Sequence, residues 1–260
     1  GGRTSKGRMI RNLLTLADDE LIQNVLRVRS FDEEAFVFFA TKQGTVKKTA
    51  LEAYSRPKKG GIRAIALEEG DEVVGVRLAR PGDQILLASN SGRAVHFDEA
   101  AARAMGRVSR GVRGMKLKEG DSVVALIVVE PENAAATVVT TCKQGYGKRT
   151  PVTDYPIKGR GNQGVINIKV TERNGDVVSA VLTQTGDELM FISEGGMVVR
   201  SRVDDMRPMG RNTQGVRLVS LKDGDLVAGV DVIGAEDLEF AAKGQGEDEA
   251  GGEGDGQPAS

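Results

Sequence analysis

Short apolar runs separated by turn-forming residues recur along most of the chain. The runs at 85–88, 123–129 and 177–181 are brief and aliphatic, and a glycine-containing turn follows about every ten residues. The triplets K-Q-G, N-S-G and E-G-G supply glycine where a hairpin needs a positive φ. A helical period is sustained only at 97–105, where it predicts one helical turn. The pattern therefore predicts an all-β fold.

One strand-and-turn pattern is repeated several times along the chain. The segments MGRVSRGVRGMKLKEGD (105–121) and MGRNTQGVRLVSLKDGD (209–225) agree at ten of seventeen positions. Looser copies occupy 6–26, 58–76 and 161–181. Aligned on the turn before the next apolar run, the copies place one set of residues in register at steps of 50 to 54 residues. These residues are Asp19, Asp71, Asp121, Gly175 and Asp225.

A second repeated element alternates with the first. It ends in a glycine turn and a basic or β-branched strand, and it occupies 40–49, 88–97, 141–150 and 192–201. A unit of about 50 residues with about four strands has the size of one propeller blade. We therefore expect residues 1–233 to form one propeller-like β-pinwheel, with four blades, a half-blade at the start and a strand at the end.

The net charge of −1 conceals a strong segregation of charge. Residues 234–260 hold eight acidic residues and one lysine, so this segment carries −7 and residues 1–233 carry +6. The segment is also rich in glycine and poor in large apolar side chains, a composition that cannot offset the entropy lost on ordering. The sequence predicts that 234–260 is a disordered acidic tail.

Within residues 1–233 the basic residues concentrate in one part of each repeat. The segments 44–63, 92–116, 145–169 and 196–217 together hold 22 Lys and Arg but six acidic residues. The rest of this region holds 13 basic and 23 acidic residues. Since equivalent loops of a radial fold recur at equivalent places, this pattern predicts one positive patch on every blade.

A periodic positive band is suited to a long polyanion. Lys and Arg bind phosphates and release counterions, which gives affinity without reading sequence. Duplex DNA is favoured over single strands because aromatic stacking residues are scarce in these segments. The predicted DNA-binding residues are Lys47, Lys48, Arg56, Lys58, Lys59, Arg63, Arg103, Arg107, Arg110, Arg113, Lys148, Arg149, Lys158, Arg160, Arg200, Arg202, Arg207, Arg211 and Arg217.

The sequence contains few residues suited to catalysis. With one histidine (His96), one cysteine (Cys142) and no clustered carboxylates, it indicates no metal site, triad or acid–base pair. A lone cysteine forms no internal disulfide and suits a reducing cytoplasm. No apolar run approaches the ~20 residues of a membrane helix, and the first residues lack the pattern of a signal peptide.

The chain resembles the family formed by the C-terminal domain of bacterial DNA gyrase A. The matching phrases are GTVKKT (44–49), RAMG (103–106), GYGKRT (145–150), KVTERNG (169–175) and GRNTQGV (210–216). The resemblance implies a six-bladed β-pinwheel that wraps duplex DNA on its basic perimeter.

The resemblance also implies a larger enzyme around this domain. It implies a bacterial, cytoplasmic, nucleoid-associated A2B2 complex of gyrase A and gyrase B, which performs ATP-dependent negative supercoiling. ATP and Mg²⁺ would act elsewhere in that complex, so no cofactor is expected in this chain. The catalytic tyrosine of the family lies upstream, and Tyr54, Tyr146 and Tyr155 do not match its segment.

One departure from the family pattern leaves alternatives open. The first-blade box Gln-Arg-Arg-Gly-Gly-Lys-Gly is absent, and its nearest relatives are RPKKGG (56–61) and RTSKGR (3–8). The first blade and part of the second are therefore expected to be missing. The C-terminal domain of the A-type protein of topoisomerase IV (decatenation), a propeller that serves as a protein-interaction platform, and a propeller enzyme remain alternatives.

Overall fold

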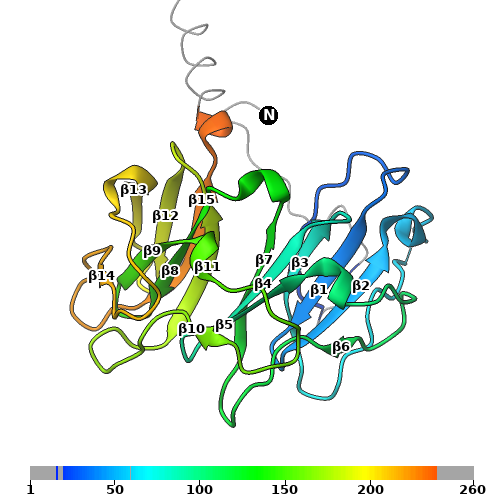
Figure 1. Ribbon diagram of the computed structural model, residues 1–260, viewed down its shortest axis with the longest axis horizontal. Coiled ribbons are helices and arrows are strands. Elements are labelled where there is room, and N and C mark those ends of the chain that lie inside the picture. The colour runs from blue at the N-terminus through cyan, green and yellow to red at the C-terminus, as the bar shows by residue number, and fades with distance from the viewer. Residues whose placement is uncertain (1–15, 17–19, 59, 239–260) are drawn as a thin grey trace, which may run out of the picture.

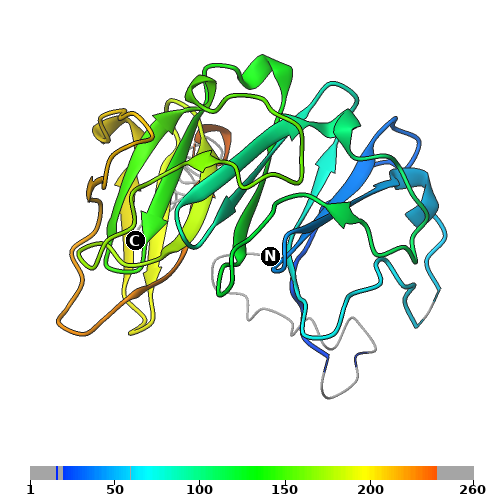
Figure 2. The same ribbon diagram turned by 60° about the horizontal axis from the view of Figure 1, so that its bottom comes forward.

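The computed structural model describes residues 16, 20–58 and 60–238 of the 260. Four antiparallel sheets fan out in an arc, with the first and last sheets at opposite ends (Figures 1 and 2). The strands are β1 (Phe36–Thr41), β2 (Thr45–Ala50), β3 (Val73–Ala79), β4 (Gln84–Ser89), β5 (Arg93–Asp98), β6 (Val112–Arg113), β7 (Val123–Val129), β8 (Thr137–Cys142), β9 (Tyr146–Pro151), β10 (Val165–Ile166), β11 (Val177–Thr183), β12 (Glu188–Ser193), β13 (Val198–Arg202), β14 (Val216–Arg217) and β15 (Val227–Ile233).

Each sheet is one blade built on a tight hairpin. The strand orders are β3-β1-β2-β6, β10-β5-β4-β7, β11-β8-β9-β14 and β13-β12-β15, and we call these sheets the first to fourth blades. Short 3-10 turns leave the hairpins of the four blades. They are η2 (Leu51–Tyr54), η3 (Glu99–Ala101), η5 (Val152–Asp154) and η6 (Val203–Asp205), and a further turn, η4 (Pro131–Asn133), precedes β8. The predicted helical turn in 97–105 corresponds to η3.

The outermost strand of a blade comes from the next repeat along the chain. Strand β6 follows β5 in sequence but pairs with β2, and β10 and β14 pair with β5 and β9 in the same way. Gly164, which precedes β10, has a φ of +69°, and a Cβ there would lie 2.1 Å from the carbonyl oxygen of Ala94. Only glycine fits this close approach, so the repeated G-V-R and Q-G-V sequences are docking sites for the preceding blade.

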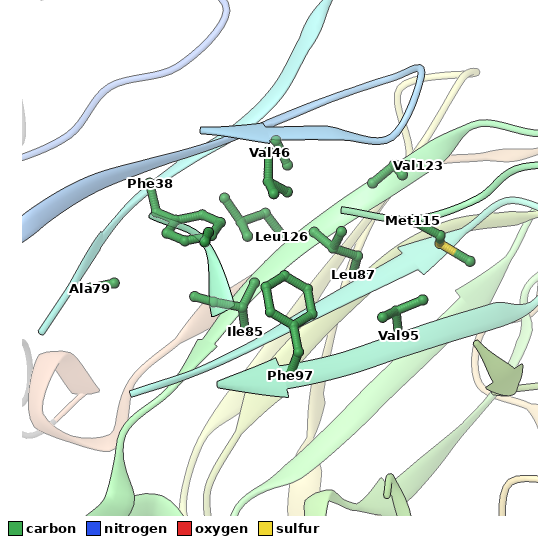
Figure 3. Close-up of a cluster of buried hydrophobic side chains, with 12 residues drawn as sticks. Phe38, Val46, Ala79, Ile85, Leu87, Val95, Phe97, Met115, Val123 and Leu126 are labelled. Carbon is green, nitrogen blue, oxygen red and sulfur yellow. The ribbon is translucent and has the colours of Figure 1, made fainter. Parts of the chain in front are cut away.

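Apolar side chains fill the space between neighbouring blades. Between the first two blades, Phe38 and Val46 of one sheet pack with Leu87 and Phe97 of the next, and all four are buried (Figure 3). Burying one such side chain contributes roughly 1.5–3 kcal/mol. The long strands β3, β7, β11 and β15 also contact one another from blade to blade. The aliphatic repeats therefore form one continuous core along the arc.

The all-β, propeller-like fold with a repeat of about 50 residues is confirmed, but three details differ from expectation. Residues 20–34 form no strand, so the expected half-blade at the start is wrong over this range. The copy in 58–76 contributes only β3, and among the described residues Ile62 and Arg63 pair with no strand of another blade. The predicted tail begins with a helical turn at 235–238, and 239–260 lie outside the described residues.

Candidate nucleic-acid interface

The predicted basic segments form the connections that bridge neighbouring blades. The connections after the second, third and fourth hairpins each pass through a 3-10 turn and end in the outer strand of the preceding blade. One backbone hydrogen bond recurs at the same point of three connections. It runs from Met105 N to Lys48 O (2.9 Å), from Lys158 N to His96 O (2.7 Å) and from Met209 N to Arg149 O (2.7 Å). The connections are thus held against the sheets at regular intervals.

A Gly-Arg pair in the second, third and fourth connections ties each of them to the connection before. Arg160 donates from Nε to the carbonyl oxygen of Ala101 (2.8 Å) and from Nη1 to that of Arg113 (2.9 Å). Arg211 repeats the pattern, to Asp154 O (2.6 Å) and Ile166 O (2.8 Å). Arg107, the equivalent in the second repeat, points its Nη1 at Arg63 O at 3.5 Å. These half-buried arginines join the separate patches into one outer band.

Most of the predicted DNA-contacting side chains that the structure describes are exposed along this band. They are Arg56, Lys58, Arg63, Arg103, Arg110, Arg113, Lys158, Arg200, Arg202, Arg207 and Arg217. Arg110 forms an ion pair with Glu68 (2.7 Å), and Arg200 forms one with Glu188. Lys59 lies outside the described residues. Contact of these side chains with DNA stays a prediction.

Lys47 and Lys148 are buried, so the prediction that they contact DNA is corrected. They occupy the same position in the first and third blades. Lys47 Nζ donates to Thr49 Oγ1 (2.5 Å) and Ala64 O (2.8 Å). Lys148 Nζ donates to Gly210 O (2.8 Å) and to Arg211 O. Burial, with the nearby positive Arg107 and Arg211, lowers the pKa of each lysine from 10.5 to about 8.

Lys48 and Arg149 hold blades together and do not face outward, so their predicted role is corrected too. Lys48, buried beside Phe36, makes an ion pair of 2.5 Å with Glu99 of η3 in the next blade. Arg149 has 11% of its side chain exposed, donates to Val203 O (3.1 Å) and lies 3.7 Å from a carboxylate oxygen of Asp204 in η6. Charge counts along the sequence do not distinguish such inward-facing cations from the outward-facing ones beside them.

Two arginines stack on Tyr146 at the outer edge of the third blade. The guanidinium carbons of Arg173 and Arg217 lie 4.6 and 5.3 Å from the ring centroid, and Arg217 Nη2 donates to the hydroxyl at 2.9 Å. Hydrogen bonding to these two arginines lowers the pKa of the Tyr146 phenol. Arg173 was missed because it lies outside the four basic segments, although its sequence context, TERNG, is part of the family resemblance. The cluster adds positive charge beside β14.

The recurring acidic residues have a structural role. Asp71 Oδ1 accepts hydrogen bonds from the backbone N–H of Gln43 and Glu72, both at 2.9 Å. Asp225 Oδ1 accepts from Gly195 N (2.9 Å) in the same way, and hydrogen bonding with Ser193 and Gly195 lowers its pKa. Asp121 accepts from Ser91 Oγ at 2.8 Å. These carboxylates of three repeats lock the inner turn to its hairpin.

The described residues show little capacity for metal or thiol chemistry. They contain no cluster of three or more His, Cys, Asp or Glu that could hold a metal ion. Cys142 is buried, and burial raises the pKa of its thiol from 9.0 to about 12, which keeps it protonated. Among the same residues no helix is long and apolar enough to cross a bilayer.

The fold defines a β-pinwheel: a propeller-like arc whose blades exchange their outer strands, with basic connections along one edge. A family model described as "DNA gyrase C-terminal domain, beta-propeller" matches residues 35–80, 83–130, 138–184 and 187–233, which are the four repeats. The chain belongs to the DNA gyrase C-terminal domain family.

Known relatives and solved structures agree with this assignment. The chain is 48% identical to the DNA gyrase A protein of Salmonella typhimurium over 228 residues, which cover 88% of this chain and 26% of that protein. It is 45% identical to the DNA gyrase A protein of Escherichia coli over 253 residues, covering 95% and 29%. The chain thus spans less than a third of the length of these relatives.

Two solved domains share its fold, each at 26% identity. The C-terminal domain of DNA topoisomerase IV gives a TM-score of 0.83 and covers 93% of this chain and 75% of that one. A DNA gyrase A C-terminal domain gives 0.77, covering 87% and 75%.

Proposed function

We propose that the chain binds, bends and wraps duplex DNA without sequence preference along its basic connections. The observation that carries the proposal is the series of Gly-Arg contacts, in which Arg107, Arg160 and Arg211 tie each connection to the one before. Exposed arginines and lysines then follow one another from blade to blade. Phosphates bound at successive blades would draw the duplex around the edge.

Distributed contacts are needed because bending is costly. Smooth bending of a short duplex by 40–90° costs of order 1–6 kcal/mol, more than one surface cation supplies. The band also lacks the pattern of a base reader: no helix in the described residues is placed for a major groove, and the fold offers short strands and loops. Backbone recognition with affinity set by counterion release is the mechanism that fits.

The test compares two variants of equal charge. Lys158→Gln with Arg217→Gln removes two charges from the band, and Lys143→Gln with Lys222→Gln removes two exposed charges outside the basic segments. Binding of random-sequence duplex is measured over a range of salt. The band variant is expected to weaken binding and to flatten the slope of log K against log salt by about 2, at roughly 0.9 per phosphate contact, while the control changes little.

Bending is measured separately, by energy transfer between dyes at the duplex ends. The band variant should reduce bending more than affinity, because the remaining blades still hold the duplex while the path is interrupted. Equal effects of the two variants, salt-independent binding, or a strong preference for one sequence would overturn the proposal.

In the whole protein, we propose that this domain presents DNA to a gyrase A2B2 complex that introduces negative supercoils with ATP and Mg²⁺. The support is 45–48% identity to DNA gyrase A proteins. The partners would be the remainder of gyrase A, together with gyrase B, in the bacterial cytoplasm at the nucleoid. The topoisomerase IV alternative rests on the TM-score of 0.83, which reports shared architecture at 26% identity.

A further inference from the structure

A cavity of about 360 Å³ lies at the junction of the second and third blades. Its lining is contributed by β4, β5 and the end of β7, by η4 and the residues that flank it, and by η5 with the segment that follows it. Most of the lining side chains are apolar, among them Val129, Pro131, Val152, Tyr155 and Ile157. Ile157 is 49% exposed, which places it on the solvent side of the cavity.

Comparison of the blade junctions explains why a cavity forms at this one. At the first junction Lys48 reaches the carboxylate of Glu99, and at the third Arg149 reaches Val203 O and Asp204. The equivalent residue of the second blade is His96, paired in register with Leu86 of β4. The imidazole of His96 is shorter than a lysine or arginine side chain. The positions equivalent to Glu99 and Asp204 are Val152 and Thr153, and neither residue is acidic. The second junction thus lacks the long ion pair that spans the other two.

His96 is left with one unused polar atom. Its Nδ1 lies 2.9 Å from the carbonyl oxygen of Tyr155, which can only accept, so Nδ1 carries the proton. Burial lowers the pKa of His96, which favours the neutral ring and leaves Nε2 as an acceptor. Nε2 is buried and has no hydrogen-bond partner in the described part of the chain, although His96 lines the cavity. Buried polar groups are rarely left unsatisfied.

We propose that this cavity is a binding site for a small, neutral, largely apolar ring compound with one N–H or O–H group, which donates a hydrogen bond to His96 Nε2. The volume is in the range of small-molecule sites, whose walls are usually apolar with a few placed polar groups. The polar side chains of this lining are those of Gln84, His96, Glu130 and Thr153. No arginine or lysine of the described residues lines the cavity, whereas the carboxylate of Glu130 does. Anions are therefore disfavoured in the cavity, although the connection that forms one of its walls belongs to the basic segment 145–169.

A bound ligand would replace the missing ion pair as the link between the two blades. It would contact His96 and Val129 from the second repeat and Val152 and Tyr155 from the third. Because such a ligand binds the folded state alone, its binding should raise the melting temperature. This inference does not depend on the DNA-binding proposal.

The test uses indole, which has an apolar ring and one N–H, and indene, which has nearly the same shape without the donor. Binding to the 260-residue chain is followed by the ¹⁵N shift of His96 Nε2 and by thermal unfolding. Indole is expected to bind saturably, to shift Nε2 and to raise the melting temperature. Indene should bind about fivefold more weakly, because one hydrogen bond contributes about 1 kcal/mol and 1.4 kcal/mol is a factor of ten. Inorganic phosphate should leave Nε2 unshifted.

Two variants establish the location. His96→Arg with Thr153→Asp recreates the Arg149–Asp204 arrangement of the next junction, and Ile157→Trp narrows the opening. Each should abolish the indole-induced increase in melting temperature, and the second keeps His96 and its ¹⁵N reporter if the first does not fold. The proposal is overturned if indole does not bind saturably, if indene binds equally well, or if the folded variants bind indole unchanged. An enclosed water would then be the partner of His96 Nε2.

Discussion

The Nζ atom of Lys148 lies 2.8 Å from the carbonyl oxygen of Gly210, 62 residues away and in the following repeat. A buried ammonium group thus fixes the loop that carries Arg211, and Lys47 holds Ala64 in the first blade at the same position. The basic residues of one segment therefore divide into two groups. Some hold the connections in place, and others are displayed by them.

The first prediction separates these two groups. Lys148→Met keeps the length of the side chain but leaves the carbonyl oxygens of Gly210 and Arg211 without their donor. The expected loss of unfolding free energy is about 1–3 kcal/mol, measured by denaturant titration. Lys158→Met, in an exposed part of the same kind of connection, should leave stability within about 0.5 kcal/mol and weaken DNA binding. Equal stability of the two variants would contradict a structural role for Lys148.

The second prediction concerns the ion pair between the first two blades. Lys48→Met leaves the carboxylate of Glu99, which has 6% of its side chain exposed, without its charged partner. Unfolding free energy should fall by about 3–5 kcal/mol, and Lys48→Met with Glu99→Leu should recover much of the loss. The exposed pair Arg110–Glu68 is the control, where Glu68→Gln should cost at most about 1 kcal/mol. Similar losses at both pairs would mean that burial at the junction does not decide the effect.

The third prediction tests the exchange of outer strands. Gly164→Ala places a methyl group 2.1 Å from Ala94 O at a φ of +69°, so β10 should detach from β5. Hydrogen exchange of the Val165 amide and of the β5 amides would report the detachment. Gly120→Ala is the control: its φ is +79°, but nothing lies within 4 Å of the added carbon. It should cost only the left-handed strain of about 1–2 kcal/mol, with β10 still protected.

The fourth prediction is a pH dependence that belongs to His96, the one histidine of the chain. Burial lowers the folded-state pKa of His96 below 6.5. As the pH falls below 6.5, the unfolded chain therefore binds a proton at this histidine before the folded chain does. Stability should therefore fall as the pH drops from about 6.5, with a slope of up to about 1.4 kcal/mol per pH unit. His96→Phe should remove this part of the slope between about pH 7.5 and 5.5. An identical slope in the variant would assign it to carboxylates instead.

Local chemistry in the sequence determined the repeating unit. Aliphatic runs of four to seven residues next to glycine turns favour hairpins through local turn chemistry, so β1–β2, β4–β5, β8–β9 and β12–β13 followed from pattern and period. The clustering of arginine and lysine in one connection per repeat also followed from the sequence, because charges can be counted along the chain. The family resemblance rested on the same local phrases.

Only the tertiary structure decided which blade receives each outer strand and which cations face inward. A two-residue strand such as β6 exists because Thr45 and Val46 of another repeat pair with it. Ile62–Arg63 has a similar sequence but forms no strand, and no partner strand faces it among the described residues. Lys47 and Lys58 likewise lie in one basic segment, yet one is fully buried and the other exposed. The reason is physical: a backbone hydrogen bond or a buried charge is stable only where a partner from a distant part of the chain satisfies it.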